Sequence, residues 1–513
     1  MKKSCIEDVN ELKAGAILSY VNVIISFIIP LFYTPIMLKK LGQAEYGLYS
    51  LSNSVISYLS LLTFGMGSAV IRYITKCRVE NDKRKMGQIA SLFLVIYLCL
   101  AGIVCLVGGG IANFSTYFFA QGLASYEIKK LQILLVIMTL STAISFPNNV
   151  FSSIVIAHEK YIFRKIIDIF GTIIAPILYL IILYCGYATI QMALVGLGIQ
   201  IFYLIVFFKY CVNKLGIRFN VKHLPFYMLK EILGFSIFVF MSALIDLLYW
   251  ATDKILIGSL IGTVAVAVYN IGGTFTTMLQ NMSSVIDGVF GTRVTALVLS
   301  KCSMESISTL LIRIGRLQYL IVSFLLSGYI VFGKQFIYFW AGPEYKLAYY
   351  VGLFTMLPLV VPLIQSIAFS TIVAQNKHQF RAIIYGIIAI VNIVATYFCI
   401  PKYGVVGAAI CTGLAYIVGN GIIMNIYYYY VTKLNIPLFW KNILSMSVVP
   451  IGCIICFGIM LKEWFVISTF SKLIVYIGLY SIVFISLSWV LTMNNYEKKL
   501  IKDLVAKVYR KFV

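Results

Sequence analysis

Fourteen long apolar runs dominate this chain and limit the folds that it can adopt. Each run is close to the roughly 20 mostly apolar residues that a helix needs to cross a bilayer. With 61% hydrophobic and only 12% charged residues, a chain of 513 residues cannot hide its apolar side chains inside a water-soluble particle. We therefore predict an all-α, polytopic membrane protein with fourteen transmembrane helices. The predicted spans are residues 15–38, 46–71, 87–112, 131–156, 166–185, 188–208, 232–257, 265–292, 317–340, 348–374, 382–400, 403–428, 442–461 and 472–493.

Two stretches that lie more than two hundred residues apart repeat one another. Residues 151–164 and 369–381 share, with one gap, Phe, Ser, Ile, Val, Lys, Phe and Arg in the same order. A second repeated pattern matches Leu41-Gly42 with Ile261-Gly262 and Leu48-Tyr49 with Val268-Tyr269. In a membrane protein, an internal duplication is typical of a transporter that binds its cargo between the two halves.

The repeats predict three domains. Residues 1–215 form an N-lobe of helices one to six, residues 216–430 a C-lobe of helices seven to twelve, and residues 431–513 hold the last two helices and a basic amphipathic tail. Because six is an even number, both copies start on the same side of the membrane. The expected architecture is two parallel six-helix pseudo-repeats around a central cavity, with alternating access by rocking of the lobes.

Most of the 41 Lys and Arg residues fall in loops of one side if both termini are cytoplasmic. Cytoplasmic loops accumulate these residues, so we expect this orientation. The net charge of +23 then lies mainly at the inner surface and favours contact with anionic membrane lipids, not with nucleic acid. In the tail, Leu500, Leu504, Val505, Val508 and Phe512 share one helical face opposite Lys498, Lys502 and Lys511, which suits a helix in the membrane interface.

Several short motifs occur together in order: residues 42–50, 64–67 with Arg72-Tyr73, 157–160, and 251–258 with Val268-Tyr269. This series resembles the polysaccharide-export branch of the multidrug/oligosaccharidyl-lipid/polysaccharide (MOP) exporter superfamily, nearest in pattern to the Wzx-type flippases of O-antigen and capsule repeat units. The resemblance implies MATE-like lobes in the bacterial cytoplasmic membrane. It also implies transfer of an undecaprenyl-diphosphate-linked oligosaccharide from the inner to the outer leaflet without chemistry on the cargo. Polysaccharide polymerase or assembly proteins are the further partners that it implies.

Two arginines stand at equivalent places in the repeats. Arg72 follows Gly67 by five residues and Arg293 follows Gly288 by five, near the inner ends of helices two and eight. Guanidinium groups match phosphate oxygens in paired hydrogen bonds. We expect Arg72 and Arg293 to receive the diphosphate of the lipid carrier. The alternative is that both merely mark the positive-inside boundary.

Other charged residues lie within the spans, where each costs roughly 2.5–3.5 kcal/mol on insertion scales unless it faces water or a partner. Lys254 could draw the anionic headgroup through the cavity. The acidic residues expected in the cavity or at a gate are Asp168, Asp246, Asp253 and Asp287. A buried structural ion pair is an equally good interpretation of Asp253 and Lys254.

The remaining predicted site residues concern motion. Arg164 and Arg381 are repeated residues in short inner loops, and we expect them to make topology or gate contacts. Pro30 and Pro35 interrupt the first span, and Pro358 and Pro362 the tenth. Prolines bend helices, so these positions are candidate hinges.

No metal ligands with the usual spacing and no nucleotide-binding motif appear in the sequence, so we expect no cofactor. The membrane potential, H+ or Na+ could drive transport. A multidrug or cation antiporter of the same superfamily is one alternative, although the span 15–38 lacks the acidic residue that such exporters often carry. A lipid II flippase is another. A membrane enzyme is disfavoured because the outer loops are short.

Overall fold

A computed structural model describes residues 2–220, 224–300, 302–375, 377–463 and 467–512. These residues are helical almost throughout and contain no strand, which confirms the predicted all-α fold. Their contacts divide the chain into two compact units, residues 1–267 and 268–513. The predicted lobes at 1–215 and 216–430 follow the sequence repeats, and that division stays a prediction.

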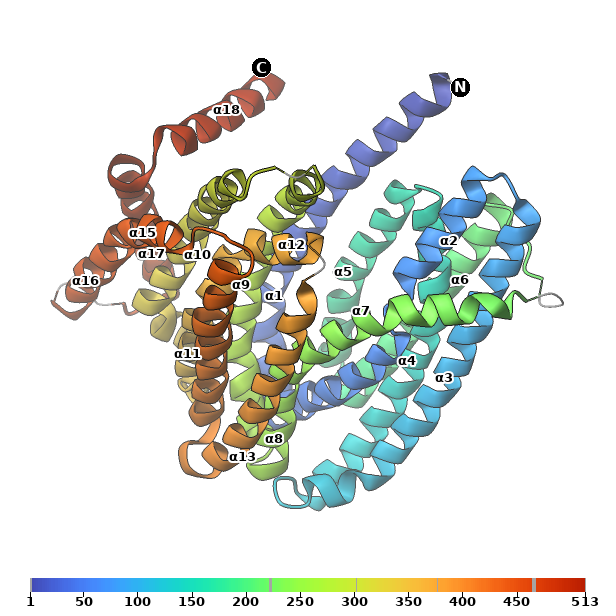
Figure 1. Ribbon diagram of the computed structural model, residues 1–513. Helices are drawn as coiled ribbons and strands as arrows, with labels where there is room; N and C mark the ends of the chain where they lie inside the picture. The colour runs from blue at the N-terminus through green and yellow to red at the C-terminus, as the bar shows by residue number, and fades with distance from the viewer. Residues whose placement is uncertain (1, 221–223, 301, 376, 464–466, 513) are drawn as a thin grey trace. The chain divides into compact units, whose positions relative to one another are not determined.

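The described residues of the first unit form eight α-helices and the beginning of a ninth, which are labelled in Figure 1. Their bounds are α1 (Lys2–Ser60), α2 (Gly67–Val79), α3 (Lys83–Phe119), α4 (Ser125–Ala157), α5 (Tyr161–Tyr184), α6 (Thr189–Lys209), α7 (Leu229–Trp250), α8 (Thr252–Leu260) and α9 (Thr263–Leu299). Short 3-10 helices cover Leu61–Thr63 and Phe226–Met228, and a π-helix covers Tyr210–Lys214.

In the second unit, the residues that the structure describes form the rest of α9 and nine further α-helices. These are α10 (Met304–Trp340), α11 (Ala348–Ile364), α12 (Ser366–Ala374), α13 (His378–Tyr416), α14 (Met424–Tyr430), α15 (Ile436–Met446), α16 (Val448–Glu463), α17 (Phe470–Leu487) and α18 (Asn495–Phe512). A 3-10 helix covers Pro343–Tyr345, and π-helices cover Ile417–Ile423 and Ser488–Thr492.

Two glycines interrupt long helices, one of them where the sequence predicts a loop between spans. Gly42 (φ 77°) breaks α1 between the predicted spans 15–38 and 46–71, and Gly404 (φ 60°) breaks α13 at the start of the predicted span 403–428. Glycine adopts such positive φ angles without a steric penalty. Below, residues 43–60 are called the second segment of α1.

Nine helices in the described part of the chain are long and apolar enough to cross a membrane, or ten if the bent pair α11 and α12 is one span. Two of the nine contain the breaks at Gly42 and Gly404. The chain is therefore a multi-pass membrane protein, while the count of fourteen spans stays a prediction.

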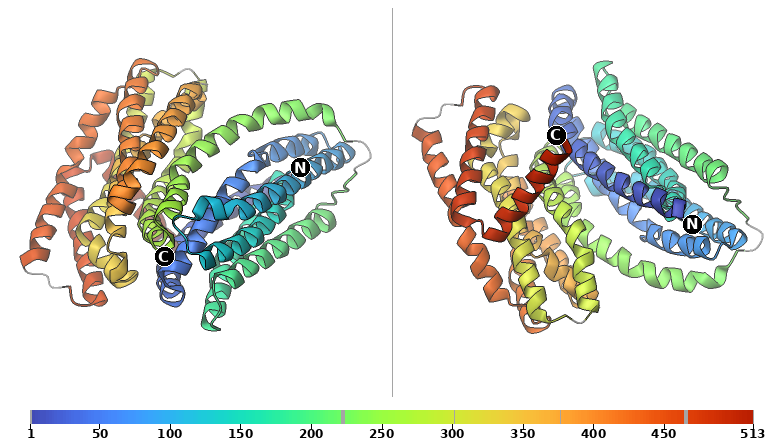
Figure 2. Two further views of the ribbon diagram at one scale, coloured as in Figure 1. Left: turned by 90° about the horizontal axis from the view of Figure 1, so that it is seen from below. Right: turned by 90° about the horizontal axis from the view of Figure 1, so that it is seen from above.

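Each unit has its own apolar core. In unit 1, α3 and α4 lie side by side along much of their length (Figures 1 and 2), and Phe93, Tyr97 and Phe146 are fully buried between them. In unit 2, α10 packs against α16 and α17 around Tyr480, whose hydroxyl bonds Ser327 at 2.5 Å. Many large apolar side chains on both units stay exposed, as expected for helices that face lipid.

Candidate functional site

A pocket of 490 Å³ lies within unit 1, between the second segment of α1 and α7. The α1 side supplies the hydroxyl groups of Ser57 and Ser60, and the following turn adds Thr63. The α7 side supplies the rings of Phe240 and Trp250. Hydroxyl groups and aromatic faces in one pocket are chemically suited to a sugar, because sugars offer both hydroxyl groups and apolar C–H faces.

The hydroxyls of this pocket belong to a polar stripe that the sequence analysis missed. Asn53, Ser57 and Ser60 are spaced i, i+4 and i+7 and so share one face of the helix. Ser57 donates to the carbonyl of Asn53 and Ser60 to that of Ser57, both at 2.8 Å, which leaves hydroxyl lone pairs available to a ligand. The spacing was readable in the sequence as a polar stripe inside an apolar span.

A sharp turn connects this stripe to Arg72. Phe64 and Gly65 both have positive φ, at 50° and 62°, and α2 begins at Gly67. The Phe64 ring packs against Phe240 of α7 with centroids 4.8 Å apart. Beyond the turn, Arg72 is exposed on α2, with its guanidinium carbon 5.9 Å from the centre of the Tyr73 ring. Unit 1 thus holds Arg72 accessible to a ligand.

The second predicted phosphate ligand has no described side chain. Arg293 lies on α9 in unit 2, and only its backbone is described. The same holds for Asp246 on α7 and Asp287 on α9. The roles of these three residues lie outside what the structure describes. The convergence of Arg72 and Arg293 joins two separate units and stays a prediction.

Asp253 and Lys254 lie on α8, immediately after a break that the sequence did not predict. The expected span 232–257 is interrupted at Ala251, where α7 ends and α8 begins. Asp253 is completely buried, whereas Lys254 is half-buried. Next to them, the Tyr58 hydroxyl of α1 bonds Thr252 at 2.5 Å, so this corner of α8 is tied to the wall of the pocket.

The turn between α8 and α9 is held to the rest of unit 1 by close backbone contacts at four glycines. A Cβ atom at Gly47 would overlap the carbonyl of Thr263, and one at Gly122 would overlap the carbonyl of Gly258. A Cβ at Gly262 (φ 118°) would come within 2.6 Å of the Gly122 carbonyl oxygen. We call Gly47, Gly122, Gly258 and Gly262 the glycine seal. Only glycine permits backbones to approach this closely.

Polar contacts surround the glycine seal. Glu45 pairs with Lys130 and accepts a hydrogen bond from Thr189 at 2.8 Å. Glu127 accepts a bond of 2.7 Å from the Thr263 hydroxyl at the start of α9. The beginnings of α4, α6 and α9 are thereby joined to α1 at one end of unit 1.

The two repeated arginines have different surroundings. The Nε of Arg164 lies 3.1 Å from Oδ1 of Asp168, an i, i+4 pair on α5. Asp168 is therefore paired with Arg164 on the same helix. A role of either residue in the cavity or at a gate stays a prediction. The guanidinium of Arg381 on α13 stacks on Phe369 and Tyr385, at 3.9 and 4.5 Å from the ring centres.

The prolines predicted as hinges behave in two ways. Residues around Pro30 and Pro35 keep helical dihedral angles, and the break in α1 lies at Gly42 instead. In unit 2, α11 contains Pro358 and Pro362, and α12 continues at an angle of 50° after Gln365. The bend is a property of the structure, whereas motion at these prolines stays a prediction.

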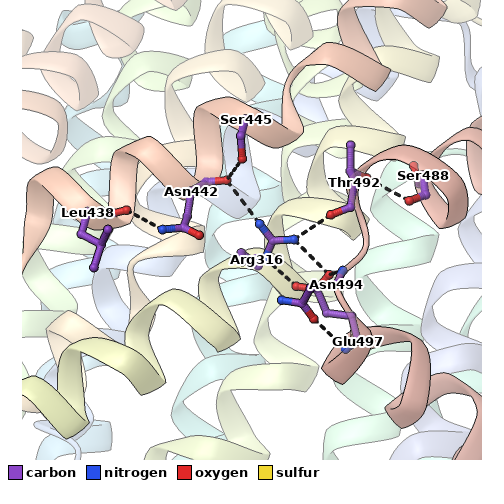
Figure 3. Close-up of polar contacts among 8 residues, drawn as sticks. All are labelled: Arg316, Leu438, Asn442, Ser445, Ser488, Thr492, Asn494 and Glu497. Carbon is purple, nitrogen blue, oxygen red and sulfur yellow. Dashed lines mark hydrogen bonds and ion pairs between the residues drawn. The ribbon is translucent and has the colours of Figure 1, made fainter.

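A buried ion pair in unit 2 escaped the sequence analysis. Arg316 of α10 and Glu497 of α18 join with Nε 2.6 Å from Oε1, and their side chains are only 8% and 1% exposed (Figure 3). Arg316 also donates to the carbonyl oxygens of Thr492 at 2.7 Å and Asn442 at 3.5 Å. The glutamate completes a reciprocal cap with Asn494. One arginine therefore ties α10, α15 and the segment before α18 to the C-terminal helix.

The fold is similar to those of known transporters. The inward closed conformation of lipid II flippase MurJ matches with a TM-score of 0.69, covering 95% of this chain and 99% of that chain at 16% identity. An inward-facing MATE family transporter of the MOP superfamily matches with a TM-score of 0.64, covering 82% of this chain and 99% of that chain at 15% identity. These likenesses confirm the MATE-like fold. Fold and membrane-spanning helices together define a multi-pass membrane protein of the MATE-like class.

The chain belongs to the polysaccharide biosynthesis protein family, whose family model matches residues 12–290, more than half of the sequence. It is 23% identical over 384 residues to the "Putative O-antigen transporter" of Shigella flexneri, covering 72% of this chain and 87% of that protein. It is 24% identical over 444 residues to the "Uncharacterized membrane protein EpsK" of Bacillus subtilis (strain 168), covering 82% and 84%. The predicted membership of the polysaccharide-export branch is confirmed.

Proposed function

We propose that this protein is a flippase that moves an undecaprenyl-diphosphate-linked oligosaccharide from the inner to the outer leaflet of the bacterial cytoplasmic membrane. The observation that carries the proposal is the pocket between α1 and α7, where Ser57, Ser60 and Trp250 supply polar and aromatic groups to an otherwise apolar bundle. The family and the O-antigen transporter of Shigella flexneri support the class of cargo.

In the proposed topology both termini are cytoplasmic. The glycine seal then lies at the outer face, and Arg72 lies toward the inner face. The pocket would receive sugar from the inner side while the seal keeps the outer side closed. Opening would require the turn between α8 and α9 to separate from Gly47 and Gly122.

The membrane potential could supply the direction of transport. Moving one negative charge outward across an inside-negative potential yields about 2.3 kcal/mol per 100 mV. A diphosphate with about two charges would gain roughly twice that amount if its charge crosses uncompensated. Coupling to H+ or Na+ is the alternative.

Rescue of strains that lack a single flippase tests the proposed cargo. Expression of this protein should restore surface polysaccharide in a strain without its O-antigen or capsule flippase, and should not restore growth of a strain without its lipid II flippase. Rescue of the lipid II strain alone would contradict the proposal and favour lipid II as the cargo.

We expect Arg72→Ala to reduce export by about tenfold or more, because hydrogen bonds to charged groups contribute roughly 1.5–3 kcal/mol. Arg72→Lys should retain an intermediate rate, since lysine keeps the charge but lacks the planar guanidinium group that donates paired hydrogen bonds to a phosphate. The measurement is the amount of surface polysaccharide in the rescued strain at matched protein level. Full export with Ala at both Arg72 and Arg293 would remove the phosphate role.

The pocket makes a separate prediction about the sugar. Trp250→Ala should lower export by about two- to twelvefold, because aromatic contacts contribute roughly 0.5–1.5 kcal/mol beyond their area. Trp250→Phe should keep most of the rate, since a ring remains. Export is compared in the same strain, and a rate for Trp250→Ala equal to wild type would exclude this ring from sugar binding.

A further inference from the structure

An apolar groove of 540 Å³ runs between α5 and α6 in unit 1, away from the residues of the proposed pocket. Its α5 wall includes Gly171 and Leu178, and its α6 wall includes Gly198 and Phe202. Gly198 leaves the groove open, since nothing lies within 4 Å of a Cβ built there, whereas the Tyr203 hydroxyl fills the space beside Gly171. In a bilayer, a groove of this character is filled by hydrocarbon.

One end of the groove is cationic. Arg164 and Asp168 precede Gly171 by seven and three residues, so all three share one face of α5. The Arg164 guanidinium carbon lies 5.2 Å from the centre of the Phe207 ring, one turn beyond Tyr203 on α6. Arg164 thus lies just beyond the end of the groove that Tyr203 lines.

The guanidinium at this end can still bind an anion. Its Nε donates a hydrogen bond to Asp168. Among the described residues, its two terminal nitrogens have no hydrogen-bond acceptor. The Arg164 and Lys165 side chains are 28% and 31% exposed, and the Lys165 Nζ lies 4.0 Å from Asp168. A guanidinium with two available nitrogens matches the paired oxygens of a phosphate.

The charges select the kind of amphiphile. Arg164 and Lys165 together with Asp168 carry a net charge of +1, which matches one phosphodiester and not a diphosphate with about two charges. Basic pockets between transmembrane helices at the cytoplasmic side commonly bind anionic lipid headgroups. We propose that this groove is a specific site for a singly charged phospholipid of the inner leaflet, with the phosphate on Arg164 and Lys165 and an acyl chain between α5 and α6. The proposal rests on the proposed topology, which places Arg164 at the inner face.

Lipid binding to the purified full-length protein in neutral detergent tests this site. The probes are dioctanoyl phosphatidylglycerol, dioctanoyl phosphatidylcholine and undecaprenyl phosphate, and the readouts are the lipid-bound species in native mass spectrometry and the thermal unfolding midpoint. Gly198→Phe fills the groove, and Arg164→Lys keeps the charge but removes the planar guanidinium group. Gly102→Phe on α3 is the matched control, because Gly102 also has open space around its Cβ.

We expect phosphatidylglycerol to bind about tenfold more tightly than phosphatidylcholine, because phosphatidylcholine offers the same phosphodiester but adds a choline cation that a site of net positive charge repels. Gly198→Phe should remove most of this preference by filling the groove. Arg164→Lys should weaken the binding of both phospholipids, because it removes the paired hydrogen bonds to their phosphate. Gly102→Phe should change neither the affinity nor the preference. Equal binding of the two phospholipids, or unchanged binding in both groove variants, would overturn the proposal. Tighter binding of undecaprenyl phosphate at the same groove would overturn it too, in favour of the carrier lipid. Since binding is measured without transport, its failure would leave the proposed flippase function untouched.

Discussion

Glu497→Ala is expected to destabilise the protein by about 3–5 kcal/mol, because it leaves the Arg316 charge buried without its partner. Arg316 would keep its bonds to the carbonyl oxygens of Thr492 and Asn442, but neither carries a compensating charge. The change should also loosen the N-terminal end of α18, since Glu497 and Asn494 exchange the hydrogen bonds that cap this helix. The thermal unfolding midpoint of the purified protein measures the effect.

Two variants make this test specific. Asp503→Ala removes an exposed carboxylate from the same helix and should leave the midpoint close to wild type. Arg316→Met combined with Glu497→Met removes both charges together and should recover much of the lost stability, because a buried ion pair can often be replaced by apolar residues at little cost. A midpoint of Glu497→Ala equal to that of Asp503→Ala would show that the pair contributes little.

Gly47→Leu is expected to abolish export, because even a Cβ atom at this position overlaps the backbone of Thr263. The neighbouring atoms belong to a helix backbone and cannot rotate away as a side chain would. Overpacking typically costs about 1–3 kcal/mol, and 1.4 kcal/mol already shifts an equilibrium tenfold. The closed arrangement of the glycine seal should therefore be lost.

Accessibility shows whether the variant acts at the seal. Ser60→Cys places a thiol in the pocket, which should resist a membrane-impermeant maleimide added from outside when Gly47 is present and react with it when Gly47→Leu is added. Labelling is measured relative to the same proteins without Ser60→Cys, which corrects for the native cysteines. Gly102→Leu on α3 provides a control with open space around the substituted atom. Normal export by Gly47→Leu, together with no labelling at position 60, would show that the seal does not gate the pocket.

Local patterns in the sequence predicted the elements of the fold. Apolar runs located the long helices, and Gly42 falls between the first two predicted spans. The pair of Arg164 and Asp168 was also readable, since it has i, i+4 spacing. Contacts between distant residues were not accessible in this way. Arg316 and Glu497 are 181 positions apart, and α10 begins at Met304, so Arg316 lies inside a helix and not in the predicted loop.

The glycine seal escaped sequence analysis for a related reason. A glycine that permits a turn and one that permits a close backbone contact look alike in a single sequence. Only the fold brings Gly47 to Thr263 and Gly122 to Gly258. The break at Ala251 could not be predicted from the sequence either, because α7 and α8 together form one continuous apolar run.

Transport in proteoliposomes tests the central claim most directly. Vesicles that contain a labelled undecaprenyl-diphosphate-linked oligosaccharide are prepared with purified protein, and the label that crosses between leaflets is measured over time. We predict that the wild-type protein moves the label well above the rate of protein-free vesicles, while Arg72→Ala and Gly47→Leu do not. Wild-type vesicles that move the label no faster than protein-free vesicles, at any imposed membrane potential or ion gradient, would contradict the account.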